Sequence, residues 1–207
     1  WKLLDEFSDD FNGTQIDDSK WYDYNPQWKG RKPGYFSRDN VNVQNGYLQL
    51  TAKYEDLAEM PDGYHTYTTA AVKSKGTVKY GYFEIRCQSM TSSASSAFWL
   101  YENTTDNWTE IDIFEIGGTA KNEENAINTN VHVFHTPTDD THWQIHKKLT
   151  VPFKHHEEFH TYGLEWDEEN IKWFVDGELY RSIPNTNWHF PLTINMDSET
   201  FPDWFGL

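Results

Sequence analysis

Short segments of alternating apolar and polar residues recur along the whole chain about ten residues apart, and this spacing limits the possible folds. Gly81–Cys87, Ala97–Tyr101 and Asn128–Phe134 are examples. Asn45-Gly46 and Asp176-Gly177 separate pairs of such segments, and these residue types tolerate the positive φ of two-residue hairpin turns. Helical periodicity is nearly absent. The pattern predicts an all-β sandwich or jelly roll of two antiparallel sheets.

The length of 207 residues predicts one domain, because β-sandwiches of this size commonly have a single core. Pro191–Asp197 is strand-like, but residues 199–207 contain no further strand, so we expect that a closing C-terminal strand is missing. No apolar run is long enough to span a bilayer. A formal charge of −16 repels nucleic acids and anionic membranes, and we expect a monomer without either partner.

The stretch from Thr109 to Ile116 interleaves three carboxylates with large apolar residues. In a regular strand, Glu110 and Asp112 would share one face, while Glu115 would point into the core. Burial of an unpaired carboxylate is costly. We therefore predict a β-bulge, one extra residue near Phe114, that returns Glu115 to the polar face.

A bulge of this kind has a geometry that suits glycoside hydrolysis. About four residue steps of ~3.3 Å separate the Cα atoms of Glu110 and Glu115 by roughly 13 Å. If both side chains lean inward, the carboxyl groups end about 5 Å apart, which is the separation in retaining glycosidases. Repulsion between the two acids would also keep one of them protonated. The alternative interpretation is a polar sheet face with three solvated acids.

Several segments resemble glycoside hydrolase family 16, in the same order as in that family. They are the stretch Glu-Ile-Asp-Ile-Phe-Glu from Glu110 to Glu115, Asp5-Glu-Phe, Phe11-Asn-Gly, Lys20-Trp21, Tyr80–Arg86 and Phe98-Trp-Leu. The resemblance implies a β-jelly roll with a concave substrate cleft over residues 1–207. It also implies that Glu110 is the nucleophile, Asp112 its helper and Glu115 the general acid/base.

Two further segments, Trp28–Phe36 and Asp197–Phe201, are similar to the β-agarase and β-porphyranase branch of the family. Four of the seventeen basic residues cluster near Trp28: Lys29, Arg31, Lys32 and Arg38. Such a cluster is either a solvated loop or a site for a sulfated sugar, because guanidinium groups pair with oxyanions in a bidentate manner. The Trp28-x-x-Arg31 spacing resembles that of porphyranases. Porphyran, which carries sulfate, is the predicted substrate, and neutral agarose is the alternative.

Four more residues are predicted to contact substrate, each with a structural alternative. Trp108 lies two residues before Glu110, and Trp99 alternates with Phe98 and Leu100, so each ring faces either the cleft or the core. His132 shares a face with Asn130 and either contacts the sugar or serves a structural hydrogen bond. Glu199 resembles a substrate-contacting glutamate of the agarase branch, whereas an exposed loop acid is the alternative.

No cofactor or metal is predicted to be required. The nine His residues and the single Cys87 form no zinc pattern. Some family members bind a structural Ca²⁺ near the segments that match Asp9 and Gly46. The family's third contribution to that site comes from a closing strand that this chain lacks, so the resemblance implies the ion only as an optional feature. Because a polymeric galactan is digested outside the cytoplasm, we expect a secreted, periplasmic or cell-surface bacterial protein. The rival class is a non-catalytic galactan-binding jelly-roll module.

Overall fold

Strands with one apolar face dominate the computed structural model of the protein, which describes residues 2–207. β14 (Asn170–Val175), for example, alternates half-buried and fully buried residues, as a strand with one face on a core requires. Within residues 2–207 the regular elements are all strands, apart from the short 3₁₀ turns η1 (Asp5–Phe7) and η2 (Arg38–Asn40). The all-β prediction is therefore confirmed.

The strands of the described residues follow in chain order. They are β1 (Trp21–Tyr22), β2 (Tyr35–Phe36), β3 (Val41–Gln44), β4 (Tyr47–Leu50), β5 (Lys53–Tyr54), β6 (Tyr67–Ser74), β7 (Gly81–Cys87), β8 (Ser95–Asn103), β9 (Trp108–Gly117), β10 (Ala126–His135), β11 (Trp143–Gln144), β12 (Lys147–Thr150), β13 (His160–Trp166), β14, β15 (Glu178–Pro184) and β16 (Thr193–Glu199).

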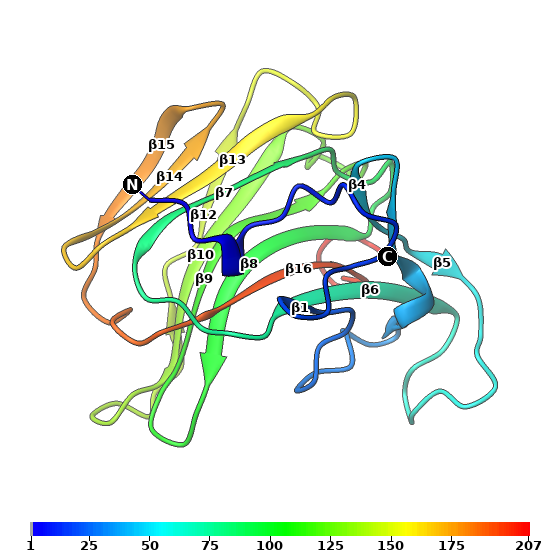
Figure 1. Cartoon of the computed structure of the whole chain (residues 1–207), viewed down its shortest axis with the longest axis horizontal. Coiled ribbons are helices and arrows are strands. Elements are labelled where there is room, and N and C mark those ends of the chain that lie inside the picture. Colours follow the sequence, from blue (N-terminus) through cyan, green and yellow to red (C-terminus); the bar gives the residue numbers. More distant parts are fainter. Residues whose placement is uncertain (1) are drawn as a thin grey trace.

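Two sheets form the sandwich. The large sheet runs in the order β1-β6-β16-β8-β9-β10-β11, and the small sheet in the order β15-β14-β13-β7. Figure 1 shows the small sheet lying over the large sheet, whose strands β6, β16 and β8 arch beneath it. Neighbouring long strands are antiparallel, as predicted, while the short strand β2 pairs parallel to β6.

Large aromatic and branched side chains fill the space between the sheets. Trp166, Trp173 and Leu164 from the small sheet belong to one buried cluster with Ile111 and Phe114 from the large sheet. Burying such side chains removes apolar surface from water, which is the main force that holds two sheets together. The opposite face of the large sheet is left free for a binding site.

The two predicted hairpin turns are confirmed. Asn45 and Gly46 have φ values of 57° and 78°, and Asp176 and Gly177 have values of 48° and 82°. Positive φ at both central positions matches the right-handed twist of the paired strands. The first turn joins β3 to β4 and the second joins β14 to β15.

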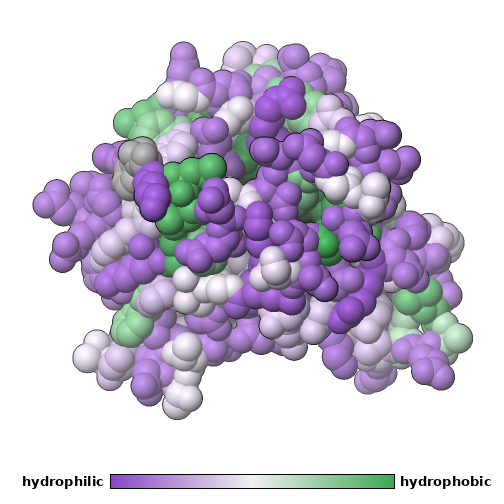
Figure 2. Space-filling view, viewed as in Figure 1, coloured by the Kyte–Doolittle hydropathy of each residue, from purple (hydrophilic) through white to green (hydrophobic). Residues whose placement is uncertain are grey.

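The surface and the chain end complete the description. Figure 2 shows the face of the molecule that is turned to the viewer in Figure 1. It is mainly hydrophilic, with hydrophobic residues in small separate patches. Among residues 2–207 there is no helix with the length and apolar character needed to cross a bilayer. After β16, the chain turns at residues 202–205. The single-domain assignment stays a prediction.

Candidate active site

β9 carries one more residue than its neighbours at the predicted position. On β8, the consecutive residues Phe98 and Trp99 pair with Phe114 and Asp112, so Ile113 has no counterpart. The pairing of β9 with β10 shifts over the same stretch. The predicted β-bulge is therefore present, and it lies at Ile113 and Phe114.

The bulge changes the direction of the side chains that follow it. Ile113 and Phe114 are consecutive, yet both lie in the buried core cluster. Alternation then resumes, with Ile116 in the core and Glu115 on the other face. As a result Glu115 shares the polar face of the large sheet with Glu110 and Asp112, as the sequence predicted.

Two indole groups from elsewhere in the fold hold the bulged strand. Trp173 of β14 crosses the core, and its Nε1 donates to the backbone oxygen of Asp112 at 2.9 Å. Trp188 Nε1 donates to the backbone oxygens of Glu110 and His132 at 2.9 and 3.1 Å. A buried indole N–H needs an acceptor. Here the acceptors belong to the strands that carry the acidic side chains, so the small sheet helps to fix their backbone.

Crowding shapes the ionisation of the carboxyl groups. Burial, the charges of Asp112 and Glu115, and a hydrogen bond with Asp112 raise the pKa of Glu110 well above its usual value. Burial, together with Asp112 and Glu199, likewise raises the pKa of Glu115, while Arg31 opposes the shift. Like charges this close cannot all ionise near neutral pH. The group therefore retains a proton that one carboxyl can donate.

His132 of β10 lies beside this acidic group. Its Nε2 is 3.3 Å from Asp112 Oδ2 and 3.6 Å from Glu110 Oε1. Its Nδ1 is 3.2 Å from Nε2 of His142. Within residues 2–207, Glu110, Asp112 and His132 are the one set of three side chains close enough to share an ion. The orienting role of Asp112 and the sugar contact of His132 stay predictions.

A second pair of acids lies on β16. Glu199 is 4% exposed, so the alternative of an exposed loop acid is wrong. Arg31 Nε donates to Glu199 Oε2 at 2.8 Å, and burial, opposed by Arg31, raises the pKa of Glu199 to about 7. Asp197 accepts a bond from Trp99 Nε1 at 2.7 Å. Burial and Glu199 raise the pKa of Asp197 as well.

Trp28 and Trp99 lie on the acidic face. Trp99 forms a small cluster with Ala97, Tyr101 and Trp28 that is separate from the core between the sheets. Its ring stacks on Tyr101 with centroids 4.6 Å apart and meets the Trp28 ring edge-on at 6.2 Å. The cleft-facing prediction for Trp99 is thus supported over core packing, although its exposed fraction is only 9%.

Trp108 also lies on this face, on the far side of the acids from Trp28. It is half-buried and stacks on Phe134 with centroids 4.2 Å apart, and Phe134 stacks in turn on His142 at 4.4 Å. His132 continues the row of parallel rings, 5.4 Å from Phe134. Aromatic clusters therefore flank the carboxylates on two sides.

The sequence profile of the β-porphyranase A–D GH16 domain matches residues 1–207, the full chain. The chain belongs to glycoside hydrolase family 16. It lies in the β-porphyranase branch of family 16, as the sequence resemblance implied, and it is a glycoside hydrolase by that membership.

Individual relatives agree with the family assignment. β-Porphyranase B of Zobellia galactanivorans is 30% identical over 223 residues, which cover 99% of this chain and 75% of that protein. The crystal structure of porphyranase B from the same organism superposes with a TM-score of 0.89 at 29% identity, covering 99% and 83% of the two chains. The predicted jelly roll is thereby confirmed.

A second relative was solved with a sugar bound. The κ-carrageenase of Pseudoalteromonas carrageenovora, in complex with an oligotetrasaccharide of κ-carrageenan, is 25% identical and has a TM-score of 0.77. The match covers 93% of this chain and 79% of that one. Family 16 relatives with this fold therefore bind galactan oligosaccharides.

Several residues of this family 16 site were missed from the sequence. They are Lys73, Tyr101, Phe134, His142 and Asp197. Three of them had a usable signal, because residues two positions apart share a strand face. Tyr101 lies two residues after Trp99, Phe134 two residues after His132, and Asp197 two residues before Glu199. The others reach the site through strand pairings or loops that the sequence does not reveal.

The calcium ion implied by the family resemblance has a weak donor set here. Asp9 Oδ1 already accepts a bond from the backbone N–H of Phe11 at 2.8 Å, and Oδ2 accepts one from Trp21 Nε1 at 3.2 Å. Calcium takes six to eight oxygen ligands, commonly with several carboxylates. In residues 2–207 no group of three acidic or His side chains gathers near Asp9. The side chains around Asp9 therefore supply few free carboxylate oxygens for this ion.

Proposed function

We propose that this family 16 hydrolase is an endo-acting, retaining enzyme that cleaves β-1,4 galactosidic bonds within porphyran. The observation that carries the proposal is the bulge in β9, which brings Glu110, Asp112 and Glu115 to one face between two aromatic clusters. A non-catalytic binding module would need the aromatic rings but not a crowded set of acids with raised pKa values.

In the first step, the ionised carboxylate of Glu110 attacks the anomeric carbon of the sugar. The bond from that carbon to the leaving oxygen breaks, and Glu115 donates its proton to this oxygen. The product is a covalent glycosyl-enzyme ester and a free galactan end. Asp112 and His132, both near Glu110, orient the attacking carboxylate.

In the second step, Glu115 acts as a base. It takes a proton from a water molecule, whose oxygen attacks the anomeric carbon and displaces Glu110. Two displacements at one carbon restore its original configuration. The proton released by Glu115 in the first step is thus recovered, and the enzyme returns to its starting state.

Arg31 supports the choice of a sulfated substrate. Within residues 2–207, the only hydrogen bond of its guanidinium group is from Nε to Glu199, so the two terminal nitrogens remain available. The guanidinium carbon lies over the Phe201 ring, 3.6 Å from its centroid, and the side chain is 41% exposed. A guanidinium group positioned in this way can pair with a sulfate ester. Agarose, which lacks sulfate, remains the alternative substrate.

The decisive experiment is reducing-sugar release measured side by side on porphyran, agarose, carrageenan and laminarin. We expect the fastest release from porphyran, with products that initially keep the β configuration in NMR spectra. Hydrolysis of laminarin alone would overturn the choice of porphyran as the substrate. Galactan binding without any release, with all three acids intact, would instead favour the binding module.

We further propose that the protein acts as a monomer outside the cytoplasm, where the polymer is found. The substrate carries this argument, because an algal polysaccharide must be shortened before uptake. Size-exclusion chromatography with light scattering tests the first part, and fractionation of the source cells tests the second.

A further inference from the structure

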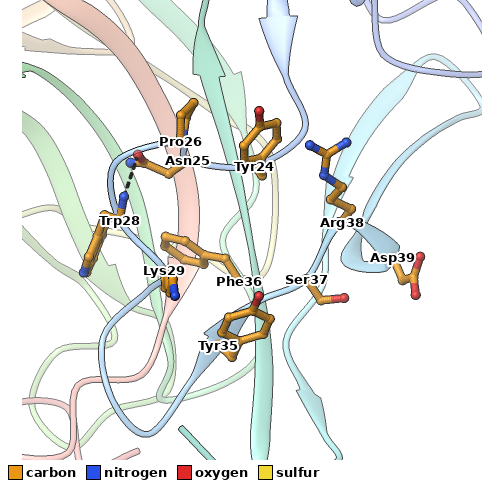
Figure 3. A pocket seen from close by; sticks show the side chains of 10 residues that line it. All are labelled: Tyr24, Asn25, Pro26, Trp28, Lys29, Tyr35, Phe36, Ser37, Arg38 and Asp39. Carbon is orange, nitrogen blue, oxygen red and sulfur yellow. Dashed lines mark hydrogen bonds between the residues drawn. The ribbon is translucent and has the colours of Figure 1, made fainter. Parts of the chain in front are cut away.

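A separate cavity lies behind Trp28. It has a volume of about 430 Å³, within the roughly 300–1,000 Å³ of small-molecule sites, and it opens between the segments 24–29 and 35–39. Tyr24, Tyr35 and Phe36 form its walls with Trp28 (Figure 3). Flat aromatic walls suit the apolar faces of sugar rings.

The aromatic walls are fixed by their neighbours. The Trp28 and Phe36 rings meet edge-on with centroids 5.1 Å apart, and the Tyr35 ring meets that of Tyr64 edge-on at 5.6 Å. Asn25 Oδ1 accepts the backbone N–H of Trp28 at 3.2 Å (Figure 3). The cavity is therefore formed before any ligand arrives, which lowers the entropy cost of binding.

The basic cluster predicted from the sequence divides into separate sites. Arg31 turns toward Glu199 in the cleft, and Lys32 lies near the Tyr64 ring. Lys29 and Arg38, in contrast, line the cavity behind Trp28. Two cations in one cavity are notable in a chain with a formal charge of −16, and they favour an anionic ligand.

Arg38 is held at the mouth of the cavity. Its guanidinium carbon lies 3.9 Å from the centroid of the Tyr24 ring, and its Nη1 is 3.3 Å from Asp23 Oδ1. The side chain is 59% exposed, so this ion pair is well solvated and contributes little by itself. Asp39, the acid that lines the cavity, points away from the other lining side chains in Figure 3.

Trp28 connects this cavity to the face that carries the acids. It is one of the residues that line the cavity, and its ring also meets the ring of Trp99 edge-on, while Trp99 pairs directly with Asp112 on the neighbouring strand. A chain bound across the acids and over Trp28 would next reach the cavity. An endo-acting enzyme leaves room for such an extension, because its polymer continues beyond the cleavage point.

We propose that the cavity lined by Tyr24, Lys29, Phe36 and Arg38 is a remote subsite for a sulfate-bearing sugar unit of the bound galactan. The aromatic rings hold the sugar, and the two cations pair with its sulfate ester. The proposal rests on the proposed function, since it assigns a further part of the same polymer to this chain.

The test compares two substrate lengths. The double substitution Lys29→Gln with Arg38→Gln removes both charges while keeping polar side chains of similar length. We expect kcat/KM to fall about tenfold on a sulfated porphyran dodecasaccharide, because two charge-assisted contacts are lost at an exposed site. On a tetrasaccharide, which has fewer sugar units to extend past Trp28, the fall in kcat/KM should be clearly smaller. Equal losses at both lengths, or no loss on the dodecasaccharide, would overturn the proposal.

A matched control and a binding assay complete the test. Lys121→Gln with Lys147→Gln removes two exposed charges away from the cavity and should leave both substrates unaffected. Calorimetry in a Glu110→Gln background measures dodecasaccharide affinity without turnover, so the subsite is tested even if the proposed activity fails. A desulfated dodecasaccharide should bind equally well with and without the two charges, and a persistent difference would refute sulfate recognition.

Discussion

Replacement of Glu199 by Gln is expected to remove the contribution of this one carboxyl group to the pH dependence of folding stability. The pKa of Glu199 is raised from the usual 4.5 to about 7 in the folded protein, chiefly by burial. A folded state with the higher pKa binds the proton more tightly. This tighter binding adds to the free energy of unfolding. The added stability is fully present below about pH 4.5 and is lost as the pH rises through about 7. A shift of this size corresponds to about 3 kcal/mol.

Urea unfolding at several pH values between about 4 and 8 measures this effect. Gln resembles the protonated Glu199 and cannot ionise, so the variant should gain about 3 kcal/mol relative to the wild type as the pH rises across this range. Glu178→Gln, at an exposed position on β15, is the control and should follow the wild type. Parallel curves for the wild type and Glu199→Gln would refute the electrostatic reasoning.

Five further outcomes are expected. Glu110→Gln should abolish release of reducing ends while galactan binding, measured by affinity electrophoresis, persists. Glu115→Gln should lower kcat on the polymer by about 10²–10⁴-fold but have less effect on an aryl glycoside with a good leaving group, a contrast that steady-state kinetics resolves. The pH–rate profile should lose activity as the pH rises through the raised pKa of Glu115, because the acid must be protonated. Arg31→Leu should lower the ratio of porphyran to agarose hydrolysis, and an unchanged ratio would contradict a sulfate contact. Trp173→Phe should lower the free energy of unfolding by about 1–3 kcal/mol in urea, because the backbone oxygen of Asp112 loses a buried donor.

Local patterns in the sequence located the strand elements that carry the acids. The segment Gly81–Cys87 was predicted with the boundaries that β7 has. The bulge was predictable because the cost of burying Glu115 leaves few other ways to place it beside Glu110 and Asp112. Such inferences need only neighbouring residues and the cost of burying charge.

β6, in contrast, was not predicted as a strand. Seven of its eight residues are buried, so its sequence from Tyr67 to Ser74 shows no alternation of apolar and polar types. It is also rich in Thr and Ala, which are small enough to pack on both faces of a sheet. Lys73 lies in this strand, and this site residue was therefore missed with it.

Contacts between distant segments were the other limit. Trp99 and Asp197 are joined by a hydrogen bond, but 98 residues separate them in the sequence. Their proximity depends on the pairing of β8 with β16, which no local pattern specifies. The distance between the carboxyl groups of Glu110 and Glu115 likewise remains a prediction of about 5 Å.

The bond from Trp173 to the backbone of Asp112 links the strand that carries the acids to the small sheet across the core. Phe114, the second residue of the bulge, likewise packs on Tyr162 of that sheet with ring centroids 4.7 Å apart. An inverting enzyme needs a wider spacing of its two acids, to admit a water molecule. To reach that spacing, a relative of this protein would have to repack the core between the sheets at the same time. Stereochemical outcome is thus an inherited property of the whole sandwich, and it should change far more slowly than preference for one polysaccharide over another.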